Sequence, residues 1–142
     1  MISTLRTTSL GTMATHPNAE VFQQVYEAFT TGNMDRLAEL IAPDVVWHIP
    51  GTNLISGEYT SREAILSCFG KMFEMTEGSY RPQLHDILAD DDHTVALLHA
   101  TGRRGGRTLD QDYAFVCHIR NGQIAELWEA WTEGVAWNDF WS

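Results

Sequence analysis

The sequence predicts an α+β domain in which N-terminal helices pack on one face of an antiparallel sheet. In the first half of the chain, apolar residues recur at three- and four-residue steps, which is the spacing of the buried side of a helix. In the second half, apolar and polar residues alternate, as they do in strands. The pair Asn121-Gly122 joins the last two alternating segments and is typical of the tight turn of a β-hairpin.

Length, charge and cysteine content exclude several classes of protein. The 142 residues suit one domain with a single core, and the formal net charge of -10 argues against nucleic-acid binding, which needs a basic face. No apolar run approaches the ~20 residues of a membrane span, and no signal-peptide pattern begins the chain. The two cysteines, Cys68 and Cys117, form no metal or redox motif. We therefore expect a cytoplasmic protein that binds neither nucleic acid nor membranes.

The helical half begins after a segment without periodicity. Residues 1–15 are rich in Ser and Thr, so we expect a flexible extension before a single domain over residues 16–142. Asn18 can cap the first helix and Ser61 the third, while glycines end both. The predicted helices begin at Asn18, Met34 and Ser61, and they end at Gly32, Ile41 and Gly78 respectively.

The strand half supplies a sheet whose last two strands form the hairpin. A short β-rich segment, Val45 to Ile49, precedes the third helix and adds a further strand. The aromatic residues after the hairpin, Trp137, Phe140 and Trp141, are expected to fold back over a pocket mouth or an interface. The remaining predicted strands run from Tyr80 to Leu88, Thr94 to Gly102, Leu109 to Ile119 and Gln123 to Trp131.

The two-residue turn also predicts which hairpin residues share a face. It places Ile119 opposite Ile124 and Ala114 opposite Glu129. Small residues opposite a carboxylate, with an indole two positions further on, indicate the wall of a cavity. The face with Glu129 is predicted to hold Ala114, Val116, His118, Ala125, Leu127 and Trp131. The other is predicted to hold Tyr113, Phe115, Cys117, Ile119, Ile124, Glu126, Trp128 and Ala130.

Three short motifs carry a resemblance to a known family. They are Gly32-Asn33-Met34-Asp35, the segment from Asp44 to Gly51, and Asn121-Gly122-Gln123-Ile124. From Ala19 to Trp141 the chain resembles the nuclear transport factor 2-like superfamily, and within it the SnoaL-like polyketide cyclases, which are relatives of ketosteroid isomerase and limonene epoxide hydrolase. The resemblance implies a cone: three N-terminal helices packed in the concave face of a curved, mostly antiparallel sheet, around an internal pocket.

The resemblance also implies where acidic groups would act. The two acidic positions of ketosteroid isomerase fall on Ile49 and Ala114, so that machinery is missing here. The last-strand carboxylate of limonene-type epoxide hydrolases matches Glu129, and their other carboxylate falls near His99. Both Glu129 and His99 are expected to point into the pocket.

Glu129 and His99 are therefore the candidate catalytic pair. Burial raises the pKa of a carboxylate and imidazole titrates near neutral pH, so the two groups could exchange protons with a substrate. The alternatives are a solvent-facing strand glutamate and a structural core histidine. The candidate substrate-binding residues are Trp47, Trp131, His85, His118, Phe69, Phe73, Tyr26 and Leu127. The histidine spacing includes neither H-x-x-x-H nor H-x-H, so no metal and no cofactor is expected.

The sequence thus favours a cofactor-independent acid/base enzyme that acts on a small apolar organic substrate. Cyclisation, isomerisation and epoxide opening remain open as reaction types, with polyketide-type secondary metabolism as the setting that the resemblance implies. The alternative is a non-catalytic binder of hydrophobic molecules or a dimeric interaction module. Because Tyr113, Phe115, Ile124 and Trp128 would form an apolar patch on the outer face, we expect a homodimer through the convex side of the sheet.

Overall fold

The computed structural model describes residues 15–142, which form four helices and one six-stranded sheet. The predicted flexible extension lies, apart from Thr15, outside the described residues. The helices are α2 (Pro17–Thr30), α3 (Met34–Glu39), α4 (Arg62–Met75) and α5 (Gly134–Phe140). The strands are β1 (Ile41–Ile49), β2 (Gly57–Tyr59), β3 (Arg81–Ala89), β4 (Thr94–Arg104), β5 (Arg107–Arg120) and β6 (Gln123–Trp131).

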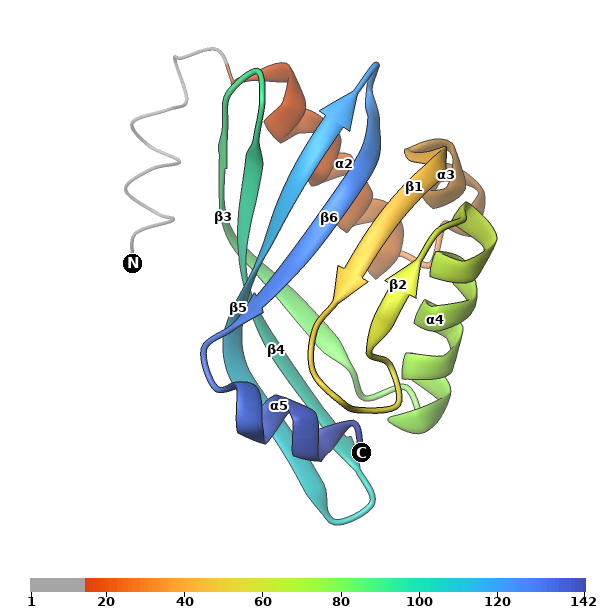
Figure 1. The fold of residues 1–142 in the computed structure, drawn as a ribbon, viewed down its shortest axis with the longest axis vertical. Coiled ribbons are helices and arrows are strands. Elements are labelled where there is room, and N and C mark those ends of the chain that lie inside the picture. The colour runs from red at the N-terminus through yellow and green to blue at the C-terminus, as the bar shows by residue number, and fades with distance from the viewer. Residues whose placement is uncertain (1–14) are drawn as a thin grey trace.

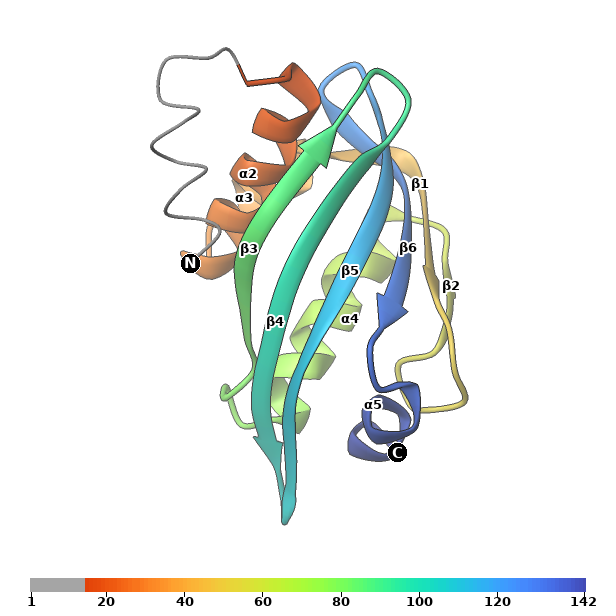
Figure 2. The same ribbon diagram turned by 90° about the vertical axis from the view of Figure 1, so that its left-hand side faces the viewer.

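The sheet curves around the helices, as the resemblance implies (Figure 1). Its strand order is β2-β1-β6-β5-β4-β3, and each neighbouring pair is antiparallel except β1 with β6, which is parallel. Figure 2 shows α2, α3 and α4 together on one side of the curved sheet. The α+β class is therefore confirmed. No helix of the described residues is long and apolar enough to cross a membrane.

The order of the helices matches the prediction only roughly. Only α2 and α3 precede the first strand, because α4 follows β2 and a fourth helix, α5, ends the chain. The predicted cap of the first helix is wrong: Pro17 takes the first helical position, and Nδ1 of His16 accepts a hydrogen bond from the Asn18 amide at 3.1 Å. Ser61 caps α4 as predicted, since its Oγ accepts from the Ala64 amide at 3.1 Å.

The segment after α3 is strand, not helix. Leu40 is the cap of α3, and Ile41 opens β1 where the prediction ended a helix. Hydrogen bonds from the start of β6 explain this difference. Nε2 of Gln123 donates to the Glu39 carbonyl at 3.0 Å, and the neighbouring Ile124 amide donates to the Leu40 carbonyl at 2.8 Å. Pairing with β6 thus extends β1 toward its N-terminus.

A bulge changes the predicted register of the β5–β6 hairpin. Ile119 lies opposite Ile124 as predicted, but the next pair joins His118 to Glu126, so that Ala125 is the extra residue. Beyond the bulge, Phe115 lies opposite Glu129 instead of Ala114. The predicted faces are therefore right for Leu127, Glu129 and Trp131 on β6, and wrong for Ile124 before the bulge and for β5 beyond it. Tyr113, Phe115 and Cys117 join them on the concave face, while Ala114, Val116 and His118 lie on the outer face.

The same correction removes the apolar patch on which the homodimer prediction depended. Of its four side chains, Tyr113, Phe115 and Ile124 point into the domain, and Trp128 alone remains outside. On the outer face, the Trp128 ring stacks on His48 with centroids 5.2 Å apart. A homodimer stays a prediction that now needs its own measurement.

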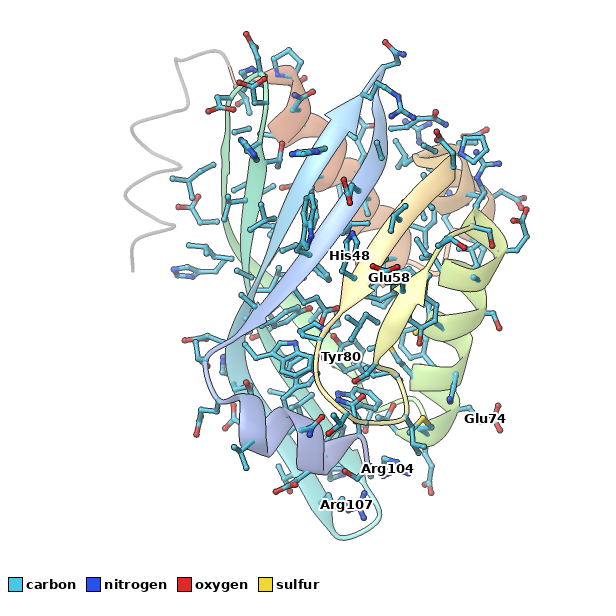
Figure 3. The ribbon with its side chains drawn as sticks, viewed as in Figure 1. His48, Glu58, Glu74, Tyr80, Arg104 and Arg107 are labelled. Carbon is cyan, nitrogen blue, oxygen red and sulfur yellow. The ribbon has the colours of Figure 1, made fainter. Side chains whose placement is uncertain are left out.

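The C-terminal helix α5 packs against the end of the sheet where β6 stops (Figure 1). Its Trp137 is buried, stacks on Trp131 at 5.1 Å and lies 5.1 Å from the Tyr113 ring. At the nearby tip of the β4–β5 hairpin, Arg104 and Arg107 donate hydrogen bonds to the Ser142 carbonyl at 2.5 and 2.7 Å (Figure 3). The C-terminal aromatics fold back onto the domain and are buried there, but none of them lines the cavity, so their predicted place over a pocket mouth or an interface stays a prediction.

Candidate functional site

A cavity of about 70 Å³ lies between the helices and the concave face of the sheet. Glu129 is the only carboxylate among its lining residues, and three tyrosines supply the hydroxyl groups. The remaining lining is apolar, as in most small-molecule sites. The lining residues are Phe22, Val25, Tyr26, Phe29, Leu37, Ile41, Trp47, Ile65, Phe69, Met72, Tyr80, Pro82, Leu98, Tyr113, Phe115, Ile124, Leu127 and Glu129.

The carboxylate of Glu129 is held from its own strand. Its Oε2 accepts a hydrogen bond from Nε1 of Trp131 at 2.8 Å, and the stacking of Trp131 on Trp137 fixes that indole. The indole N–H of Trp47 also acts on the carboxylate. The site therefore presents, beside the cavity, a carboxylate with one oxygen anchored by a hydrogen bond.

Burial raises the pKa of Glu129 to about 7. The hydrogen bond from Trp131 and the nearby indole N–H of Trp47 favour the charged form and offset part of this rise. The Trp47 N–H is close enough to act on the carboxylate, yet it meets no hydrogen-bond geometry and has no partner among residues 15–142. Glu129 can consequently both hold and release a proton near neutral pH.

Tyr80 and Tyr113 form a hydroxyl pair in the same cavity. Tyr80 comes from the loop before β3 and lies within the body of the domain (Figure 3), and Tyr113 comes from β5. Their oxygens are 3.2 Å apart, and each residue is less than 5% exposed, at 4% and 3% respectively. Burial raises the pKa of both hydroxyls, so both stay protonated at neutral pH.

Most of the predicted aromatic binding residues line the cavity. Trp47 and Phe69 contact each other with ring centroids 5.2 Å apart, and Tyr26 and Leu127 also belong to the lining. Phe73 does not line it, but packs behind it against Phe29 at 5.4 Å. Trp131 acts on the site through its hydrogen bond to Glu129.

His99 does not meet Glu129, and the prediction that it points into the pocket is wrong. In β4 the residues Ala96, Leu98 and Ala100 are buried, so His99 faces outward. Its two ring nitrogens contact Asp112 at 2.7 Å and Asp110 at 2.6 Å. Both contacts raise the pKa of His99, and the contact with Asp112 has the larger effect. His99 forms a charged cluster on the outer surface.

The other two predicted histidines also lie outside the cavity. His118 is on the outer face of β5, where its Nδ1 lies 3.8 Å from Glu126 Oε1. His85 occupies the position where the β3–β4 register shifts, and it borders an outer groove together with His99. The outer face carries one further histidine, His48, whose nitrogens contact Glu58 at 2.9 Å and Glu126 at 2.7 Å (Figure 3). Within residues 15–142 no group of three or more metal-ligating side chains converges.

The tyrosine pair was not predicted from the sequence. Tyr113 was expected on the outer face because the bulge at Ala125 was not predicted, and Tyr80 was expected only to start a strand. A usable signal was present in β5, where Tyr113, Phe115 and Cys117 alternate with smaller or more polar residues. Such a continuous bulky face is typical of a strand side that is fully buried.

Comparisons with known proteins agree on one family. A model of the SnoaL-like domain matches residues 22–127. Bal32a, from a soil-derived mobile gene cassette, is 34% identical with a TM-score of 0.85, and the match covers 89% of this chain and 97% of that one. IdmH from Streptomyces antibioticus, a candidate polyketide cyclase, is 25% identical with a TM-score of 0.68, over 83% of this chain and 93% of that one.

Two further similar proteins are uncharacterised. An uncharacterized protein of Mycobacterium tuberculosis, Rv0034, is 25% identical over 131 residues, which are 92% of this chain and 100% of that protein. A protein of unknown function with a cystatin-like fold from Xanthomonas campestris is 27% identical with a TM-score of 0.81, over 87% of this chain and 96% of that one.

Proposed function

The chain belongs to the SnoaL-like family, and from that premise we propose that it is a cofactor-independent acid/base enzyme for a compact, largely apolar organic molecule. Glu129 is the group that takes a proton from the substrate and returns it. The observation that carries the proposal is this single carboxylate in an otherwise apolar cavity, with its pKa raised to about 7.

A carboxylate with this pKa suits proton transfer in both directions. General acid/base catalysis is most effective when the pKa of the group lies near the working pH, because both protonation states are then populated. Anchoring of Oε2 by Trp131 leaves Oε1 of Glu129 to meet a substrate proton. Isomerisation needs one proton removed and one returned, and ring closure needs the same at different atoms.

The cavity limits the size of the substrate. An engineered apolar cavity of roughly 150 Å³ admits benzene, whereas the cavity here is about 70 Å³. The substrate is accordingly compact, or the partly exposed aromatic walls supplied by Phe29 and Phe69 move when it binds. The likeness to IdmH supports cyclase or isomerase chemistry, and it does not define the ring that would be formed.

The test compares wild type with Glu129→Gln on compact compounds of three kinds: a β,γ-unsaturated ketone, a hydroxy-enone that can close a ring, and an epoxide. Product formation and uptake of solvent deuterium are followed by NMR. Replacing the proton-transfer group is expected to lower turnover about 100-fold or more. Glu39→Gln is the control, because Glu39 pairs with Arg36 on the surface.

Two outcomes would count against this function. Wild-type turnover in Glu129→Gln would remove Glu129 from the chemistry. Saturable binding of the compounds to the wild type, with neither product nor deuterium uptake at any pH, would instead establish a non-catalytic binding protein.

A further inference from the structure

We propose that the Tyr80–Tyr113 hydroxyl pair is an oxygen-binding subsite, which donates a hydrogen bond to the carbonyl oxygen of a compact ketone or enone. The inference rests on the proposed function, because it names the chemical class of substrate for the same cavity. Both tyrosines line that cavity together with Glu129, and they reach it from different elements of the fold.

The hydrogen bonds of the pair leave one hydroxyl proton without an acceptor. The two oxygens are 3.2 Å apart, so one hydroxyl donates to the other. Neither hydroxyl makes another hydrogen bond within residues 15–142. Two hydroxyls carry two protons and their mutual bond uses one of them, while an unpaired buried donor costs free energy. A ligand with an acceptor atom would satisfy the second proton.

The pair is suited to donate and not to lose its proton. Burial, followed for Tyr113 by the neighbouring Tyr80 hydroxyl, raises the pKa of both groups well above their ordinary values. Both hydroxyls consequently remain neutral in the pH range where Glu129 titrates. The two kinds of group then have separate tasks, since the carboxylate can move a proton while the hydroxyl holds an oxygen.

The indole N–H of Trp47 is a further donor beside the cavity. It acts on the Glu129 carboxylate, yet it completes no hydrogen bond among the described residues. Together with the spare tyrosine proton, it gives the cavity more donors than a hydrocarbon could satisfy. A carbonyl oxygen carries two lone pairs and brings no proton of its own, so it matches this excess of donors.

The experiment uses cyclopentanone and its hydrocarbon analogue methylenecyclopentane, in which the oxygen is replaced by a methylene group. The variant is the double substitution Tyr80→Phe with Tyr113→Phe, because either single variant leaves one hydroxyl able to donate. Replacing both partners by apolar groups of similar shape is close to neutral for stability, so the fold is retained. Tyr59→Phe is the matched control, since Tyr59 does not line the cavity and its hydroxyl already donates to the Ile55 carbonyl at 2.7 Å.

Two readouts report on the subsite. The infrared C=O stretch of bound cyclopentanone is expected at lower frequency in wild type and Tyr59→Phe, and the double variant is expected to lose that shift. NMR titration is expected to show roughly fivefold weaker ketone binding in the double variant, with binding of methylenecyclopentane unchanged. A folded double variant that keeps both the shift and the affinity overturns the proposal.

The same measurements separate this inference from the proposed function. Glu129→Gln is expected to keep the infrared shift while turnover is lost. If the shift depends on the tyrosines but no variant at Glu129 affects turnover, the subsite stands and acid/base catalysis by Glu129 fails. If turnover depends on Glu129 but the infrared shift does not depend on the tyrosines, acid/base catalysis by Glu129 stands and the subsite fails.

Discussion

Burial decides what Glu129 can do at neutral pH. In water its carboxyl group would be fully ionised, whereas in the cavity the cost of desolvating the charge brings its pKa to about 7. Two indoles limit that rise, one through a hydrogen bond of 2.8 Å from Trp131 and the other through the nearby N–H of Trp47. The same residues that hold the carboxylate thus also set its proton affinity.

The raised pKa makes stability depend on pH. The unfolded chain loses the Glu129 proton near the ordinary value of 4.5 and the folded chain only near 7, so the contribution of this group to stability falls as pH rises between these values. Glu129→Gln removes the effect. In denaturant unfolding, the free energy of unfolding of Glu129→Gln relative to that of wild type should increase across this pH range, by on the order of 3 kcal/mol at most. An unchanged difference at all pH values would contradict the assigned burial.

The hydrogen bond from Trp131 is tested by Trp131→Phe. Because this bond stabilises the ionised form, its loss should raise the pKa of Glu129 further and move the basic form to higher pH. Turnover at pH 7 is expected to fall roughly fivefold and to recover at higher pH. Trp128→Phe, on the opposite face of the same strand, is the control and should leave the pH profile in place. A fall in turnover that is equal at every pH would indicate lost packing.

At the scale of elements, β6 beyond its bulge was predictable, whereas Ile124 and the face of β5 were not. Alternation from Leu127 to Trp131 was sufficient to place Glu129 inside, because a strand with one buried face has a period of two. The bulge at Ala125 decides which face of β5 is buried. No glycine stands at this position to signal a bulge in the sequence. In β4 every residue from Val95 to Leu98 is apolar, so alternation could not identify its buried face. The pairing of His99 with Asp110 and Asp112 became visible only in the register.

The His99 cluster has a pH dependence opposite to that of Glu129. Its contacts raise the pKa of His99 above 6.5, so their contribution is present below that value and is lost as pH rises through the folded pKa. The side chain is 36% exposed and its partners more so, which limits the size of the effect. His99→Gln should lower the melting temperature at pH 6 and have little effect at pH 9. Turnover of His99→Gln should equal that of wild type, and a loss of turnover would show that His99 takes part in the reaction after all.

Helix α5 supports the cavity from outside. Trp137 contacts both Trp131 and Tyr113, the residues that fix Glu129 and half of the hydroxyl pair. Trp137→Ala is expected to cost about 3–5 kcal/mol of unfolding free energy, as for other large buried aromatics. Val135→Ala, on the same helix at a position 80% exposed, should stay within about 0.5 kcal/mol of wild type. If urea unfolding gave the same loss of unfolding free energy for Trp137→Ala and Val135→Ala, α5 would not support the cavity through Trp137.

At the scale of the molecule, one curved sheet separates two kinds of chemistry. The concave face holds an apolar cavity with one carboxylate and unpaired donors, while the outer face holds histidines that are paired with carboxylates. The class of fold and its pocket followed from the chain's periodicity and its resemblance to the family. Which histidines and tyrosines entered the pocket depended on bulges and cross-strand pairs, which are tertiary features.

The homodimer prediction belongs to this scale as well. Its predicted patch is reduced to Trp128, so sedimentation equilibrium has to test it directly: the mass of two chains for wild type and of one chain for Trp128→Glu would support a homodimer through the outer face. Wild-type protein that sediments as a single chain at all concentrations would contradict the prediction.

The proposed acid/base function depends most directly on the proton affinity of Glu129 in the intact protein. Titration of the ¹³C-labelled side-chain carboxyl groups by NMR, with the Glu129 signal assigned through Glu129→Gln, measures it without any substrate. The expected midpoint is about 7. A midpoint at the ordinary glutamate value of 4.5 would show a solvated carboxylate, and the acid/base function built on it would not hold.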